Sequence, residues 1–506
     1  MKKQEALDRL HAIDRDVKHL SQIAALLQWD QETYMPPAAV EGRSEQLALL
    51  EGIVHEKSTS PEIGGLLEQL GSTTVNPMGD ADLPVVERDF LRVLRKQYDR
   101  AVLLPADLVT EAARAEGLSQ AAWVEARKHN DYITFMPHLE KMVGYAKKKA
   151  ECWGFTERPY DGLLDIHEPG MTETSIEAVF NPLRSRLSSL VQRIGEKNAP
   201  RSDFLSRKFP AELQAQFGES VMKALAYDLQ QGRLDISAHP FTTTLGPRDV
   251  RITTRYFPTN ILSGLFSIIH ETGHALYEMG FAEEIRDSSL GDGASMGIHE
   301  SQSRLWENVV GRSYAFWKGQ FPQLRQLFPT QLADVSVDEF YAAVNQVRPS
   351  LIRVDADEVT YSLHVILRFE LERRLFAGTV SVADLPEAWN AMMKEILGVT
   401  PDTDANGVLQ DVHWSMGAFG YFPSYALGNL YGLQFWDALK LDIPEVEFFI
   451  ERKDYMPILQ WLRNHVHVHG FRYEPGDLLL KVTGKPLSAD SFISYLEHKY
   501  GQLYKL

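Results

Sequence analysis

Apolar residues recur at every third or fourth position along most of this 506-residue chain, and this spacing is typical of amphipathic helices. The first such stripe, in residues 5–30, consists of Leu7, Leu10, Ile13, Val17, Leu20, Ile23 and Leu27. The alternation typical of strands is scarce, and its clearest case is residues 248–260, where Val250 and Ile252 share one face. The sequence therefore predicts a mainly α fold with a small β-sheet.

Proline, glycine and polar clusters divide the helical pattern into segments. The breaks are Pro36 and Pro37, residues 71–84, Pro105, residues 158–172, residues 196–203, and residues 407–432, which are rich in glycine and aromatic side chains. The chain shows no internal repeat and no shift in composition that would mark a domain boundary. We therefore expect one domain over residues 1–506.

Charge and cysteine content limit the partners and the compartment. The formal net charge is −17, whereas nucleic-acid binding needs a basic face and an anionic membrane attracts basic clusters. The single cysteine, Cys152, allows no intrachain disulfide and fits a reducing compartment. Residues 1–17 lack the apolar segment of a secretory signal, and no apolar run approaches the roughly 18 residues of a membrane span. We expect a cytoplasmic protein with no nucleic-acid or membrane partner.

The stretch SIIHETGHALYEMG, residues 267–280, carries the strongest chemical signal. Asn260 is placed to cap the helix that contains it, and Gly280 is placed to end that helix after about five turns. His270 and His274 then lie on one face, where two imidazole nitrogens can bind one zinc ion. The alternative is a helix with surface histidines, but the apolar residues before the motif would bury both rings without a partner.

A zinc site of this kind needs a third ligand. HESQSRLWENVVG, residues 299–311, starts a second helix after a glycine-containing loop. Glu300 is the candidate, because a glutamate on a second helix one loop downstream resembles the layout of gluzincin zinc sites. Glu307 is the competing candidate, but it lies further along that helix and is expected to pair with solvent or an arginine. Glu271 points to the side of the two histidines, where it can take the proton of a zinc-bound water as that water attacks a carbonyl.

Further short blocks make the chain resemble the carboxypeptidase Taq family of metallocarboxypeptidases. The blocks are HETGH itself, DVRIT (249–253), HESQ (299–302), IRVDAD (352–357), GVLQDVHW (407–414), HPF (239–241) and WDQETYMP (29–36). The resemblance spans essentially the whole chain. It implies a zinc exopeptidase that removes C-terminal residues from peptides one at a time, with Glu271 as the general base.

The resemblance also implies features that the residues alone do not. The implied fold is a saddle of helices around a deep groove, similar to angiotensin-converting enzyme and the thimet-type oligopeptidases. Residues 1–200 would cover the groove, and residues 235–435 would form the zinc-site part, with a small sheet beside the zinc helix. The implied enzyme is a homodimer of broad specificity with C-terminal proline disfavoured, and it binds one Zn2+ per subunit, for which Co2+ can substitute.

An exopeptidase must bind the terminal carboxylate of its substrate, and the planar fork of arginine suits that task. Arg353, at the start of the predicted helix 352–378, is the first candidate, and an ion pair with Asp357 is compatible with that role. Arg251 is the second candidate, with a solvated strand residue as the alternative. His239 is expected to line the groove, and its alternative is an ordinary loop histidine.

Peptide hydrolysis also needs donors for the oxyanion of the tetrahedral intermediate. His413, Tyr421 and Tyr425 are the candidates for this role, with His413 and Tyr421 preferred and Tyr425 also expected to contact the substrate. The alternative is that these aromatic residues belong to the core. Asp292 or Asp249 is expected to orient a zinc histidine from behind, and the sequence does not choose between them.

Two rival functions stay open. An endo-acting zinc oligopeptidase would carry the same zinc site without an arginine that closes one end of the groove, and Arg353 favours the exopeptidase. An inactive helical scaffold that binds peptides or partners would need none of His270, Glu271, His274 and Glu300 together, and their joint presence argues against it.

Overall fold

A computed structural model describes residues 2–506. Within this range it has twenty α-helices and one three-stranded sheet. The helices are α1 (Lys3–Thr33), α2 (Val40–Ser58), α3 (Pro61–Gln69), α4 (Val85–Val102), α5 (Ala106–His129), α6 (Tyr132–Cys152), α7 (Pro159–His167), α8 (Glu173–Gly195), α9 (Ala211–Ala224), α10 (Ile261–Glu278), α11 (Met296–Arg304), α12 (Tyr314–Leu327), α13 (Val337–Val344), α14 (Tyr361–Phe376), α15 (Leu385–Leu397), α16 (Phe422–Asp442), α17 (Val446–Glu451), α18 (Met456–His465), α19 (Pro475–Thr483) and α20 (Asp490–Tyr504). The prediction of a mainly α fold is confirmed.

The sheet is small and lies against α10. Its strands are β1 (Leu234–Ile236), β2 (Thr242–Gly246) and β3 (Asp249–Thr254), with β3 in the middle, parallel to β1 and antiparallel to β2. Val250 and Ile252 are fully buried and pack with Ile268 and Ala275 of α10. The predicted strand is therefore confirmed, although it is shorter than expected, and β1 and β2 were too short to predict from their residues.

The main core runs through the whole chain, from Ala6 in α1 to Tyr504 in α20. The predicted stripe of α1 joins this core only in its first half, because Ile23 in the second half is 49% exposed. The second half of α1 packs against α2. The structure describes every residue of α2, and none of these residues is buried. Helical spacing predicted the helix but not how far along it the core extends.

Most predicted breaks are confirmed, but three boundaries are wrong. The stretch 158–172 contains α7, because Pro159 occupies the first helical position, where its missing N–H costs nothing. Residues 422–432 are the start of α16 and not part of the glycine-rich break. The helix expected from residue 352 begins at Tyr361, and a short 3-10 turn, η4 (Arg353–Asp355), precedes it.

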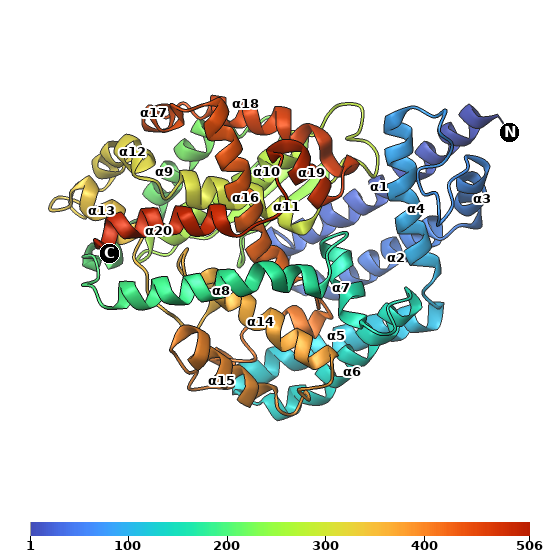
Figure 1. Cartoon of the computed structure of the whole chain (residues 1–506), viewed down its shortest axis with the longest axis horizontal. Helices are drawn as coiled ribbons and strands as arrows, with labels where there is room; N and C mark the ends of the chain where they lie inside the picture. Colours follow the sequence, from blue (N-terminus) through green and yellow to red (C-terminus); the bar gives the residue numbers. More distant parts are fainter. Residues whose placement is uncertain (1) are drawn as a thin grey trace.

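In Figure 1, α10, α11 and α16 lie in the middle of the molecule, α1–α4 occupy its right side, and α5 and α6 lie along its lower edge. No helix in residues 2–506 is both long enough and apolar enough to cross a membrane.

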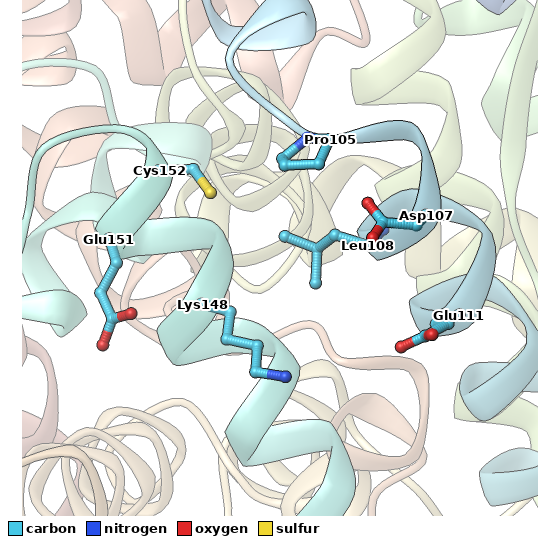
Figure 2. Close-up of a pocket in the computed structure, with 7 residues that line it drawn as sticks. All are labelled: Pro105, Asp107, Leu108, Glu111, Lys148, Glu151 and Cys152. Carbon is cyan, nitrogen blue, oxygen red and sulfur yellow. The ribbon is translucent and has the colours of Figure 1, made fainter.

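A surface hollow lies between the start of α5 and the end of α6 (Figure 2). Asp107 and Glu111 face it from α5, and Lys148 and Cys152 face it from α6. The predicted site residues, all of which lie within residues 2–506, are not part of its lining. This hollow is therefore separate from the predicted site.

Candidate active site

Helix α10 carries the HETGH motif, as the sequence predicted. The side chain of Asn260 accepts a hydrogen bond from the Ser263 N–H at 3.2 Å and caps the first turn. The helix ends at Glu278 with Met279 as its C-cap, and Gly280 follows directly, as expected. His270 and His274 face the same side, and their ring centroids lie 4.8 Å apart.

Glu300 reaches these histidines because α11 runs very close to α10 and α16. A Cβ at Gly273 of α10 would lie 2.7 Å from the Gln302 carbonyl oxygen of α11. A Cβ at Gly428 of α16 would lie 2.6 Å from Cγ of Glu300 itself. Real Cβ atoms do not approach other atoms so closely, so glycine is required on both sides of α11.

The three predicted ligands converge. Oε2 of Glu300 lies 3.6 Å from Nε2 of His270 and 3.4 Å from Nε2 of His274, and one donor atom from each of the three lies within 4.8 Å of the others. Bonds of about 2.0–2.2 Å in a tetrahedral zinc site place neighbouring donors about 3.4 Å apart. The spacing and the donor types therefore fit a zinc ion.

Behind the ligands, each histidine ring has a partner for its second nitrogen. Nδ1 of His270 lies 2.9 Å from Glu307, and Nδ1 of His274 lies 2.6 Å from Nδ1 of His299. Nε2 of His299 in turn lies 2.8 Å from Glu278. Such partners fix the tautomer of a ligand so that its other nitrogen can face the metal.

These contacts correct the expectation for the supporting residues. Asp249 forms an ion pair with Arg251, and Asp292 accepts a hydrogen bond from the adjacent Gly293 N–H, so the ring partners are Glu307 and His299 instead. Glu307 was expected to pair with solvent or an arginine, and it does contact an arginine, but it is buried and also contacts His270.

Electrostatics favour ionised Glu300 and neutral His274. Burial opposes the charge on Glu300, but Arg304 and His270 outweigh it and hold the pKa of this carboxyl well below its usual range. Arg304 Nε donates to Glu300 Oε1 at 2.7 Å. Burial lowers the pKa of His274 to about 3. A deprotonated carboxylate and a neutral imidazole are the forms that bind metals.

Glu271 lies beside the ligand set, on the sheet side of α10. Its Oε2 accepts a hydrogen bond from the Thr242 hydroxyl of β2 at 2.6 Å. Burial raises the pKa of Glu271 above its ordinary value, while His270 and the Thr242 hydroxyl act in the opposite direction. A carboxylate of raised pKa is the better proton acceptor near neutral pH.

Arg353 is buried in a cluster with two other charged side chains. Its Nε and Nη2 donate to Asp411 Oδ1 at 3.1 and 2.9 Å. Arg368, which is fully buried, donates to the other oxygen of Asp411 at 2.7 Å. The expected partner Asp357 instead accepts hydrogen bonds from the backbone of its own loop, at Val359 and elsewhere. Two guanidinium groups thus share the carboxylate of Asp411, which leaves one positive charge in excess within this group of three.

A chain of contacts joins the Arg353 cluster to the histidine pair. Arg353 Nη1 donates to the Tyr361 hydroxyl at 3.1 Å. The guanidinium of Arg304 stacks 4.2 Å from the centroid of the same Tyr361 ring, and Arg304 also bonds Glu300. The excess positive charge therefore belongs to the same site as the three predicted ligands.

His413, Tyr421 and Tyr425 form an aromatic group next to Arg353. The turn η6 (His413–Met416) carries the histidine, whose Nε2 lies 3.1 Å from the Tyr425 hydroxyl. The Tyr421 ring lies 5.5 Å from that of His413 and 5.2 Å from that of Tyr425, centroid to centroid. Burial lowers the pKa of His413 to about 4 and raises that of Tyr421 to about 12. The structure therefore brings the two predicted oxyanion donors together, the tyrosine in its protonated form.

Arg251 and His239 are placed differently. Arg251 pairs with Asp249 at 2.8 Å, and its guanidinium stacks 4.3 Å from the Trp29 ring centroid of α1. These contacts brace the sheet against the helix, so the alternative of a solvated strand residue is wrong, and contact of Arg251 with substrate stays a prediction. His239 is exposed in the loop between β1 and β2, and its contact with substrate stays a prediction.

Arg368, Asp411 and His299 were not predicted to belong to the site, and Glu307 was considered only as a competing metal ligand. Asp411 and His299 lie within the family blocks GVLQDVHW and HESQ, and their place in these blocks could have identified them as site residues. Arg368 sits in α14 among several charged residues, and its spacing gives no sign that it is buried.

The helical fold and this site are those of a metallopeptidase. A family model described as carboxypeptidase Taq (M32) metallopeptidase matches residues 9–500. The chain is 43% identical to thermostable carboxypeptidase 1 of Thermus thermophilus, with all of both chains covered, and 39% identical to carboxypeptidase 1 of Bacillus subtilis, with 97% of both covered. The crystal structure of an M32 carboxypeptidase from Deinococcus radiodurans R1 superposes with a TM-score of 0.96 at 42% identity, covering 99% of this chain and 100% of that one.

The chain therefore belongs to the carboxypeptidase Taq family. It is a metallocarboxypeptidase whose family uses a divalent metal, and the resemblance inferred from the short blocks is confirmed.

Proposed function

We propose that this enzyme is a zinc carboxypeptidase that releases C-terminal amino acids from peptides one at a time. His270, His274 and Glu300 would hold the zinc ion, for which the donor spacing of 3.4 and 3.6 Å is the support. The excess positive charge around Arg353 is the observation that favours an exopeptidase. A buried unpaired charge is costly, and the carboxylate at the end of a peptide is the partner it lacks.

The protein side chains would divide the chemistry between them. Zinc, when bound, supplies a Lewis acid that lowers the pKa of water and polarises a carbonyl. Glu271 takes the proton of the attacking water and passes it to the leaving amine. His413 and Tyr421 donate hydrogen bonds to the oxygen of the scissile carbonyl as its negative charge develops.

Arg353 would set the register of cleavage. Its guanidinium binds the terminal carboxylate of the peptide, so the scissile bond is the one that joins the last residue. Tyr425, whose ring lies 4.7 Å from the Arg353 guanidinium, contacts the same residue of the substrate. Arg251 and His239 complete the substrate-binding set, further along the peptide.

Other features of the proposal rest on the family resemblance. We expect broad specificity with C-terminal proline disfavoured, activity with Co2+ in place of Zn2+, and one metal ion per subunit of a cytoplasmic homodimer. We also expect one domain, in which residues 1–200 cover a groove and residues 235–435 carry the zinc site. Light scattering that gives the mass of one chain would refute the dimer.

The decisive experiment is a mass-spectrometric time course on an N-terminally blocked peptide, with and without a zinc chelator. We expect a ladder of products that lose one C-terminal residue at a time, and no ladder with chelator. The same peptide with an amidated C-terminus is the control and should be cleaved poorly. Internal fragments, or efficient cleavage of the amide, would favour an endo-acting oligopeptidase.

A further inference from the structure

Glu372 of α14 is a fully buried carboxylate that the chemistry above does not use. It accepts three hydrogen bonds. Trp414 Nε1 donates to its Oε1 at 2.8 Å, and the Tyr160 hydroxyl and the Gly420 N–H donate to its Oε2 at 2.7 and 2.9 Å. Burial raises the pKa of Glu372 to about 7, whereas these three donors favour its ionised form.

Two of these donors lie at the ends of the segment 413–421, whose first and last residues are the proposed oxyanion donors. Trp414 directly follows His413, and Gly420 directly precedes Tyr421. One carboxylate therefore binds the chain beside each of the two side chains. The segment between is not a regular helix, because Gly420 has a φ of 78°, so its shape depends on such side-chain contacts.

Helix α7 holds the same segment from the other side. A Cβ at Gly420 would lie 2.7 Å from the Leu163 carbonyl carbon of α7, so the two backbones are in direct contact. The ring of His167, at the end of α7, lies edge-on to that of Tyr421 with a centroid separation of 5.0 Å. Tyr160, in the first turn of α7, provides the third hydrogen bond to Glu372. The segment thus lies between α7 and α14, and Glu372 links all three.

We propose that Glu372 is a positioning residue that holds His413 and Tyr421 at the separation required for catalysis. This inference rests on the proposed function, because it assigns Glu372 to the support of those two donors. An ionised carboxylate suits the position because it only accepts hydrogen bonds, and here every partner is a donor. A glutamine would turn an NH2 group toward at least one of those donors and would loosen the segment on that side.

The test compares Glu372→Gln with the control Glu370→Gln, made two residues away on the same helix. Glu370 pairs with Arg373 and has no contact with the proposed donors in the described structure. We expect Glu372→Gln to lower kcat about tenfold to a hundredfold, as displacement of catalytic groups by an ångström does, with KM changed less than about threefold. Metal content should stay equal to that of the wild type, and Glu370→Gln should match the wild type throughout. Wild-type kcat in folded Glu372→Gln, or joint loss of kcat and metal, would overturn the proposal.

Tyr160→Phe provides the second variant, because it removes one donor and leaves the buried charge unchanged. If Glu372→Gln shows no cooperative thermal transition, Tyr160→Phe decides, and we expect it to lower kcat about threefold with a melting temperature near that of the wild type. Full kcat in that variant would then refute the positioning role.

A double-mutant cycle shows whether Glu372 acts through Tyr421. The combined loss of kcat in Glu372→Gln with Tyr421→Phe should be smaller than the product of the single losses, because both changes affect one interaction. Independent, multiplicative losses would refute the link. A wild-type enzyme that gives no C-terminal ladder would refute the proposed function and this inference together, whereas an active wild type with an equally active Glu372→Gln refutes only the inference.

Discussion

Replacing Arg353 by alanine tests the charge argument most directly. In the wild type, Arg353 and Arg368 share Asp411, and a substrate carboxylate is expected to neutralise the excess charge. After the substitution, Arg368 still pairs with Asp411, so no buried charge is left without a partner. We therefore expect the variant to fold and to keep its metal, while it loses the group that binds the end of the peptide.

The expected loss follows from the kind of interaction removed. Deleting one partner of a desolvated, charge-assisted contact costs about 2 to 4 kcal/mol. Since 1.36 kcal/mol corresponds to a factor of ten, kcat/KM should fall roughly 30- to 1,000-fold. Most of the fall should appear in KM, because the terminal carboxylate is bound in the ground state and in the transition state alike.

The assay measures kcat/KM on one peptide with a free and with an amidated C-terminus, for the wild type, Arg353→Ala and Arg348→Ala. Arg348 is an exposed arginine near the same turn and serves as the control. The wild type and the control should strongly prefer the free carboxylate, and Arg353→Ala should lose that preference. A variant that keeps the full preference would refute the assignment, whatever its absolute rate.

Three further predictions concern the metal, the base and a buried acid. Glu271→Gln should retain one zinc ion per chain by elemental analysis yet lose at least about a thousandfold in kcat, and substantial activity would remove Glu271 as the base. Glu307→Gln should weaken zinc binding about 10- to 100-fold in chelator competition, because Glu307 orients His270, and unchanged affinity would contradict that role. Burial raises the pKa of Glu168 in the folded protein to about 7. Between the ordinary pKa of about 4.5 and pH 7 this carboxyl ionises in the unfolded chain but stays protonated in the folded protein, so wild-type stability falls as pH rises. Glu168→Gln should therefore gain in melting temperature over the wild type by pH 8 but not at pH 5, and an equal difference at both pH values would refute this.

Local sequence predicted those parts of the site that depend on local geometry. The spacing of His270 and His274 fixes their common face on any α-helix, and Asn260 fixes where that helix starts. Glu300 could be chosen because a glycine-containing loop and a second helix follow. The common face of the two histidines and the start of α10 survive in the structure because they depend on residues within a few turns of one another, whereas Glu300 lies 26 residues after His274, on a second helix.

The remaining members of the site depend on distant contacts. Asp411 meets Arg353 and Arg368 across the fold, and the expected pair with Asp357 failed because η4 breaks the helix on which that spacing was based. Glu307 shows the same limit, since a stretch of π-helix, η3 (Leu305–Val310), begins just after α11 and carries its carboxylate. Such local unwinding is common near functional sites and has no signature in hydrophobic spacing.

The distribution of buried charge connects these contacts to the choice between exo- and endopeptidase. Around the ligand set, the carboxylates of Glu271, Glu300 and Glu307 outnumber the guanidinium groups of Arg304 and Arg312, which favours a divalent cation there. Around Arg353 the positive charges are in the majority, and the Tyr361 side chain lies between the two groups. An internal stretch of peptide carries no charge on its backbone and would leave the Arg353 cluster unbalanced, whereas a peptide that ends there brings the missing carboxylate. The same buried cluster that stabilises one end of the site thus disfavours an endo-acting mode, without any need for a steric barrier.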